Sequence, residues 1–128
     1  MRDETRAWLT YADENFEVAK LVLSHGYVNA CLHNIQQTIE KALKAVVVER
    51  ELEFRRTHSV RELTQLLATK RLFIDVSDEE VDLIDSIYVP SQYPAYGVLP
   101  DSPRDQGIAE RCLEISKRIR ASVDSILE

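Results

Sequence analysis

Glycine and proline are scarce in this sequence, with three glycines and four prolines among 128 residues. All-β domains need many tight turns, which use these two residues, so their scarcity favours long regular elements. No apolar run approaches the ~18 residues that cross a bilayer, and the first residues, MRDETRAW, lack the apolar core of a signal peptide. We therefore expect a cytoplasmic protein without a membrane segment.

Basic residues are outnumbered by acidic ones, 16 to 22, which gives a formal charge of −6. Indiscriminate binding to a nucleic-acid backbone needs clustered Lys and Arg, so this balance opposes it. Local basic stretches remain at residues 55–61 and in the last predicted helix, where either could hold a phosphate or an acidic partner. With 45% hydrophobic and 30% charged residues, the composition is that of one globular domain, which we place at residues 1–128.

Cysteine is limited to Cys31 and Cys112, each among apolar residues of a predicted helix. Such positions are more typical of buried thiols than of a disulfide or a reactive cysteine. Two cysteines cannot form a metal site alone. His33 and Glu40 lie about 10 Å apart along a helix and cannot share an ion without ligands from elsewhere. We expect no metal and no cofactor.

Apolar residues recur every three or four positions in two long stretches, one over residues 3–25 and one from residue 28 to beyond residue 46. This spacing predicts two long helices. Gly26 between them is placed as a left-handed C-terminal cap, and so short a connection makes the helices antiparallel. Residues 51–59 lose the periodicity and are predicted to form a connector.

The third and fifth helices are predicted from apolar spacing together with a capping residue. Leucines mark the third helix, whose N-cap is either Thr57 or Ser59: Leu63, Leu66 and Leu67. The fifth helix begins with Ser102 as N-cap and Pro103 at the first helical position, and isoleucines carry its apolar side to the C-terminus.

The fourth helix has a start signal of its own. Ser77 and Glu80 form a capping box, and Val76 and Val81 are placed for a hydrophobic staple. Its buried side is predicted at three positions: Val81, Ile84 and Tyr88. Residues 89–103 hold all four prolines and are predicted to be irregular. These elements make the fold all-α, with about five helices.

A row of polar side chains runs along the second helix, opposite its apolar side. At about 100° per residue, its members follow at steps of four, three and four: His33, Gln37, Glu40 and Lys44, with Lys41 at the edge. We interpret the row as a solvated face in which Glu40 and Lys44 form an i,i+4 ion pair. The alternative is a face that binds a ligand or a partner.

His58 lies at the start of the third predicted helix, in RRTHSV. It is either a capping or loop-anchoring imidazole or a contact to a phosphate or nucleotide. Arg55, Arg56 and free backbone N–H groups at the helix start would assist the second role. Nucleophilic catalysis has little support, because no Gly-x-Ser-x-Gly elbow, Gly-rich phosphate loop or His-Glu-x-x-His occurs. The proline-rich loop with Tyr93 either covers the core or contacts a partner.

Three stretches, in this order, resemble the HEPN domain family, the nucleotide-binding helical domain of higher eukaryotes and prokaryotes. They are LVLSHGYVNACLHNIQQTIEKALKA, THSVRELTQLL and SIYVPSQYPAYG, preceded by a long helix with Trp8 and followed by a last long helix. The resemblance implies an up-and-down bundle of about five helices, usually a homodimer. It also implies a minimal nucleotidyltransferase as partner, often in a toxin–antitoxin pair. The family's polar positions correspond to Gln37, Glu40, Lys41, Lys44, His58, Tyr93 and Pro94.

Two departures from the family pattern concern activity. Many HEPN proteins are metal-independent ribonucleases, marked by an arginine separated from a histidine by four to six residues. No histidine here has an arginine at that spacing, and Arg50 misses His58 by one residue. The family's Arg-Tyr-Pro is replaced by Gln92-Tyr93-Pro94. Any anion contact made by that arginine is therefore lost or made by a neighbour.

We therefore expect a non-catalytic, dimeric binding module that pairs with a nucleotidyltransferase-type protein and takes a nucleotide or another anion. Its ligand- or partner-binding residues are expected among Gln37, Glu40, Lys41, Lys44, His58 and Tyr93. No catalytic residue is assigned. The alternatives are a divergent metal-independent ribonuclease that uses His58 on RNA, and a purely structural dimer module.

Overall fold

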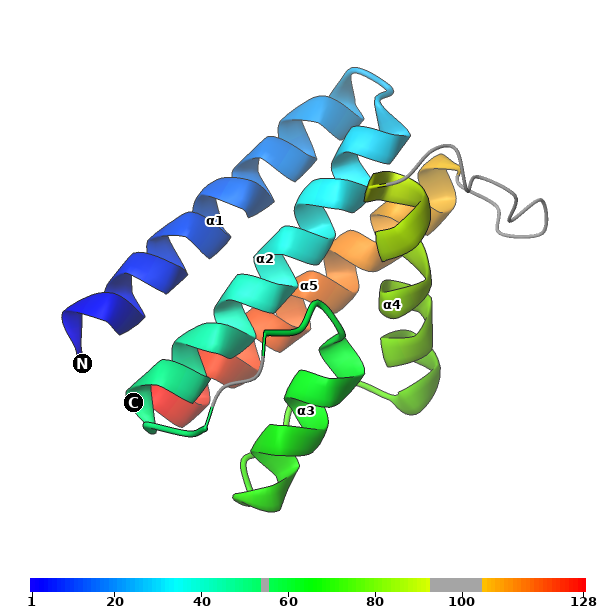
Figure 1. Ribbon diagram of the computed structural model, residues 1–128. Helices are drawn as coiled ribbons and strands as arrows, with labels where there is room; N and C mark the ends of the chain where they lie inside the picture. The colour runs from blue at the N-terminus through cyan, green and yellow to red at the C-terminus, as the bar shows by residue number, and fades with distance from the viewer. Residues whose placement is uncertain (54–55, 93–104) are drawn as a thin grey trace.

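A computed structural model describes residues 1–53, 56–92 and 105–128 of the chain. Its regular elements are α-helices: α1 (Asp3–Ser24), α2 (Val28–Glu49), α3 (Val60–Thr69), α4 (Asp78–Gln92) and α5 (Gln106–Leu127). The predicted all-α fold with five helices is confirmed (Figure 1). Within the described residues, no helix combines the length and the apolar character needed to cross a membrane.

The turn between α1 and α2 depends on Gly26, as predicted. Gly26 has a φ of +81°, in the left-handed region, where a side chain would strain the backbone. The Gly26 N–H donates to the Leu23 carbonyl, and the Tyr27 N–H donates to the Val22 carbonyl, each at 2.9 Å. These bonds satisfy the last carbonyls of α1. The turn reverses the chain, so α1 and α2 run side by side and antiparallel (Figure 1).

The core is organised around α2, which packs against each of the other four helices. In Figure 1, α1 lies on one side of α2, and α3 and α4 lie on the other. Small side chains let α1 approach closely, because Ala12 and Ala19 are fully buried and the Thr38 hydroxyl donates to the Ala12 carbonyl at 3.0 Å. Because other helices cover α2 on several sides, few of its side chains can contact solvent.

Side-chain caps define where α3 and α4 begin. Of the two candidates for α3, Ser59 is the N-cap, because its hydroxyl accepts from the Glu62 N–H at 3.2 Å. Thr57 instead accepts from the Ser59 N–H at 3.0 Å. At α4 the capping box is confirmed, with reciprocal bonds between Ser77 and Glu80 of 2.9 and 3.1 Å. The description of side chains in α4 ends at Ile87, so the expectation for Tyr88 lies outside it.

Two predicted boundaries are wrong. Helix α5 begins at Gln106, and its N-cap is Asp105, whose carboxylate accepts from the Ile108 N–H at 2.9 Å. Ser102 and Pro103, the predicted start, lie outside the described residues. Helix α4 extends to Gln92 and includes Pro90. A proline in the last turn removes one backbone hydrogen bond close to the helix end, which the helix tolerates better than a proline in its middle. The rest of the predicted irregular stretch, residues 93–103, is outside the described part.

Candidate functional site

No residue of the polar row on α2 is fully exposed and two of the five are buried, so its interpretation as a solvated face is wrong. Glu40 is 4% exposed, Lys44 is 8% exposed and the neighbouring Gln36 is fully buried. Projection of a single helix separates polar from apolar sides but does not show which neighbours cover them. Here His58 of the connector from α2 to α3 lies against Glu40. On the other side, the Trp8 and Tyr11 rings of α1 lie against Lys44 and Lys41, so the connector and α1 cover the row.

The Glu40 carboxylate is the centre of this buried network. Its Oε1 atom lies 2.5 Å from the Lys44 ammonium and 2.9 Å from Nδ1 of His58. Its Oε2 atom accepts from the Gln36 side-chain amide at 3.0 Å. Burying a carboxylate is costly unless a counter-charge and hydrogen-bond donors satisfy it, and these three side chains supply both.

His58 is held by two hydrogen bonds that converge from α2. Its ring bonds to Glu40 through Nδ1, and its backbone carbonyl accepts from the Gln36 amide at 3.0 Å. Because a carboxylate can only accept, Nδ1 of His58 carries the proton of this hydrogen bond. The side chain is 52% exposed. His58 was expected either to anchor the loop or to contact a phosphate or nucleotide. These two hydrogen bonds anchor the loop.

The N-terminus of α3 is occupied by a carboxylate from α4. Asp85 accepts from the backbone N–H groups of Val60 at 2.7 Å and Arg61 at 3.2 Å, and from the Ser59 hydroxyl at 3.1 Å. The interpretation that free N–H groups here would bind a phosphate is therefore wrong, because Asp85 already uses them. Of the two arginines expected to help, Arg56 is exposed and Arg55 lies outside the described residues.

Lys41 and Gln37 line the more open edge of the row, towards α1. The Lys41 ammonium donates to the Asn15 side chain at 2.8 Å and lies 5.9 Å from the centre of the Tyr11 ring. The Gln37 amide donates to Gln36 at 3.0 Å. Burial, and then the charge of Lys41, lower the pKa of His33, so that its ring is neutral at pH 7.

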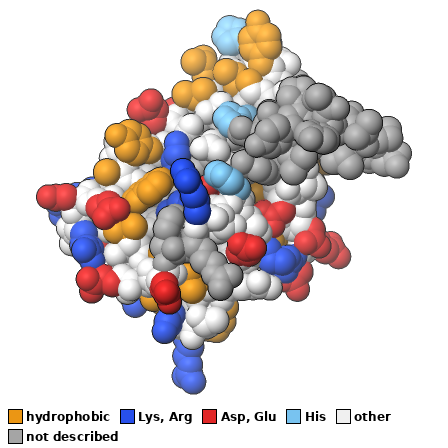
Figure 2. Space-filling model, viewed as in Figure 1, with side chains coloured by type: hydrophobic (Ala, Val, Ile, Leu, Met, Phe, Trp, Pro, Cys, Tyr) orange, Lys and Arg blue, Asp and Glu red, His pale blue; other side chains and the backbone are white. Residues whose placement is uncertain are grey.

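Figure 2 shows histidine side chains and Lys or Arg side chains next to one another near the middle of this face. Towards α1, the Lys44 ammonium lies 5.7 Å from the centre of the Trp8 ring, so both lysines of the row lie over aromatic rings of α1. A cation over an aromatic face is attracted by the ring quadrupole. The edge facing α1 therefore combines two cations with two rings.

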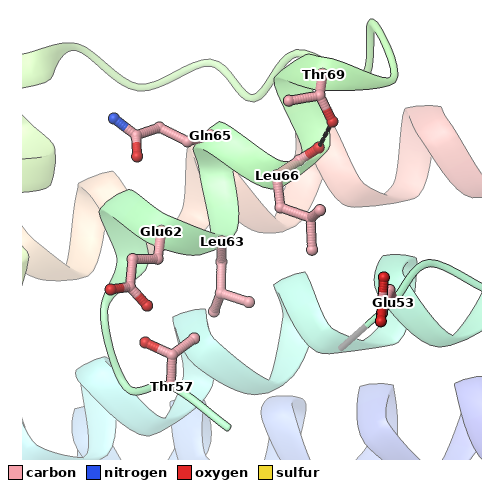
Figure 3. Close-up of a pocket in the computed structure, with 7 residues that line it drawn as sticks. All are labelled: Glu53, Thr57, Glu62, Leu63, Gln65, Leu66 and Thr69. Atoms are coloured by element: carbon pink, nitrogen blue, oxygen red, sulfur yellow. Dashed lines mark hydrogen bonds between the residues drawn. The ribbon is translucent and has the colours of Figure 1, made fainter. Parts of the chain in front are cut away.

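A cavity of about 500 Å³ lies on the other side of the connector, against α3 (Figure 3). Thr57, Leu63 and Leu66 line it together with two carboxylates, Glu53 and Glu62. None of its described lining residues is basic, so this cavity would repel a phosphate. Between this cavity and the edge of the row that carries the lysines, the lysine edge is the better suited to an anionic ligand.

Metal and thiol chemistry find no support in the described part of the chain. No group of three or more His, Cys, Asp or Glu side chains there could hold a metal ion. Cys31 and Cys112 are free and fully buried, as predicted. Burial raises the pKa of each thiol to about 11, so both stay protonated and unreactive near neutral pH.

A family model described as HEPN domain matches residues 5–126. The chain belongs to the HEPN family. A crystal structure of the protein TT1696 from Thermus thermophilus superposes on this HEPN domain with a TM-score of 0.78, at 27% identity, over 98% of this chain and 99% of that one. The archaeal HEPN homologue ST0689 matches with a TM-score of 0.73, at 23% identity, over 99% and 100% of the two chains, and supports the fold. No curated protein shows a significant match to the sequence.

Three residues of this HEPN domain's polar site were given no role from the sequence: Gln36, Asn15 and Asp85. Two of them could have been recognised because a polar or charged residue there lies on the apolar side of its helix. Gln36 follows Ile35 on the side that faces the core, and Asp85 is four residues after the buried Val81. Asn15 carries no such signal, because its partner Lys41 is distant in sequence. Tyr93, with Pro94, lies outside the described residues.

Proposed function

We propose that this HEPN domain is a non-catalytic, dimeric binding module that pairs with a minimal nucleotidyltransferase, in a toxin–antitoxin pair, and binds a nucleotide. Membership of the family supports the dimer and the partner. One structural observation supports the non-catalytic role and the place of the ligand. The Glu40 carboxylate is engaged by Gln36, Lys44 and His58, so this part of the α2 row holds the fold together. Ligand binding is then left to the open edge, where Lys41 and Gln37 are partly exposed.

The open edge suits a nucleotide chemically. Lys41 supplies a cation for a phosphate, and the Tyr11 ring beside it is 58% exposed and offers a surface on which a base can stack. The partly exposed Gln37 adds an amide group, which can hydrogen-bond the edge of a base.

Calorimetric titration with ATP and GTP tests the nucleotide part of the proposal. We expect binding by the wild-type protein and a loss of about tenfold in affinity in Lys41→Met, because one phosphate contact is removed. Lys20→Met is the matched control, since Lys20 also lies over a ring, 5.1 Å from the centre of Phe16, but on another part of α1. Equal binding by the wild type and Lys41→Met would contradict this site.

Sedimentation and a second titration test the assembly. The proposal expects a particle of twice the 14.7 kDa chain mass, and heat on titration with a purified cognate nucleotidyltransferase. A monomer that gives no heat with that partner would contradict the assembly even if ATP binds. A dimer in which substitution of Lys41 changes only solubility would favour the purely structural module instead.

A second candidate function, metal-independent RNA cleavage, is favoured by one contact. Glu40 orients His58 through Nδ1, as a carboxylate orients the imidazole of a catalytic dyad. The arginine nearest to the family spacing is, however, used elsewhere, because the Arg50 guanidinium donates to the Ile126 carbonyl at 3.2 Å. RNA cleavage that disappears in His58→Ala would establish this second function.

A further inference from the structure

The molecule has a second recess, a groove of about 260 Å³. It lies between α3 and the segment that joins α3 to α4. Five of its nine lining residues are apolar: Ala68 of α3, Phe73, Ile74 and Val76 of the joining segment, and Val81 of α4. The other four are polar or charged: Arg61, Thr64, Gln65 and Asp78. Figure 1 shows this region at the opposite end of the molecule from the turn between α1 and α2. The groove shares no lining residue with the Glu40 network or with the Lys41 edge.

Phe73 at the rim of the groove is 71% exposed, the highest value among the large hydrophobic side chains of the described part. An exposed phenylalanine beside an apolar groove leaves a continuous apolar surface in water, which is unfavourable for a protein that stays alone. Aromatic side chains at the edge of a pocket are typical anchors of protein interfaces. The position of Phe73 therefore points to a bound partner.

Charge is distributed unevenly along the same groove. Arg61 and Asp78 line one end, and the Arg61 guanidinium already binds Asp82 at 2.6 Å and Asp78 at 3.5 Å. The side chains of Asp78 and Asp82 remain 94% and 71% exposed, and Glu79 beside them is exposed as well. Three carboxylates against one arginine make this end acidic. The nearby cations Lys70 and Arg71 follow α3 at its other end.

We propose that this groove docks a short segment of a partner protein that carries a large apolar side chain next to a lysine or arginine. The apolar side chain packs against Phe73 and the groove wall, and the cation lies over Asp78 and Asp82. A phosphate-bearing ligand does not suit the acidic end. The proposal concerns a surface separate from the nucleotide edge, so it stands or fails independently of the proposed function.

A labelled synthetic peptide with two arginines followed by two leucines tests the proposal on the whole 128-residue chain. Amide shifts in NMR spectra should cluster in α3 and residues 72–81, and fluorescence anisotropy should give an affinity. In Phe73→Ser we expect binding weakened about tenfold, the usual effect of removing an interface anchor. Tyr27→Ser is the matched control, because Tyr27 is 64% exposed and lies at the turn between α1 and α2. The control should bind as the wild type does.

The charge part of the proposal has its own control peptide, in which the two arginines are replaced by aspartates. We expect it to bind more weakly than the basic peptide, with a difference that shrinks in Asp78→Asn and at high salt, because the attraction is electrostatic. Circular dichroism verifies that each variant is folded. Equal loss in Phe73→Ser and Tyr27→Ser, equal binding of both peptides, shifts outside the groove, or no shift with the basic peptide would each overturn the proposal.

Discussion

Replacing Lys44 with methionine should destabilise this protein far more than replacing the neighbouring Lys41. The side chains of Lys44 and Glu40 are 10% and 5% exposed, with 2.5 Å between ammonium and carboxylate. Removing one partner of a buried ion pair leaves an uncompensated charge, which costs roughly 3–5 kcal/mol. Glu40 would keep Gln36 and the half-exposed His58 as hydrogen-bond partners, so we expect the lower end of this range, about 3 kcal/mol.

Urea unfolding followed by circular dichroism measures this cost, and a thermal midpoint lower by about 10 °C should accompany it. Lys41→Met is the control. Lys41 is partly exposed and bonds the neutral Asn15, so its loss should cost about 1 kcal/mol or less. The double variant Glu40→Gln/Lys44→Met should recover part of the stability, because neither charge is then left unpaired. Equal costs for Lys44→Met and Lys41→Met would refute the buried pair.

Three further predictions concern other parts of the fold. Asp85→Asn should weaken the start of α3 by about 1–2 kcal/mol, because a charged acceptor at a helix N-terminus becomes neutral; hydrogen exchange in α3 measures this. The pKa of Glu49 is lowered by the hydrogen bond from the Arg2 N–H and then by that from the Thr5 hydroxyl. The ionised Glu49 therefore stabilises the fold above the pKa that it has in the unfolded chain, and this stabilisation disappears as the pH falls through its pKa in the folded protein. Curves of stability against pH for the wild type and Glu49→Gln should converge at acidic pH. Neither cysteine of the folded protein should react with a thiol reagent at pH 8, and fast labelling before unfolding would contradict their burial.

Local signals made much of the fold predictable. The Gly26 turn and the Ser77–Glu80 capping box each involve residues within a few positions, so their chemistry can be read directly from the sequence. The prediction of where α5 begins failed, and the reason is local too. Both Ser102 and Asp105 are good N-caps, and sequence alone does not decide between two good caps that are three residues apart.

The candidate site was harder to predict because it depends on contacts between distant residues. Glu40 and Lys44 were correctly paired, but whether they meet water is decided by Trp8 of α1 and by the connector that carries His58, 18 residues further along. Asp85 likewise caps a helix that begins 25 residues before it. Periodicity describes one helix at a time, whereas burial is a property of the packed bundle.

Incubation with RNA tests most directly whether this HEPN domain binds rather than cleaves. Total RNA would be treated with wild-type protein, with His58→Ala and with His33→Ala as a histidine control, and then examined by denaturing gel electrophoresis. Because Glu40 and Gln36 hold His58 as an anchor and Arg50 is bound to α5, the account predicts intact RNA with all three proteins. Cleavage by the wild type and His33→Ala that is absent with His58→Ala would contradict it.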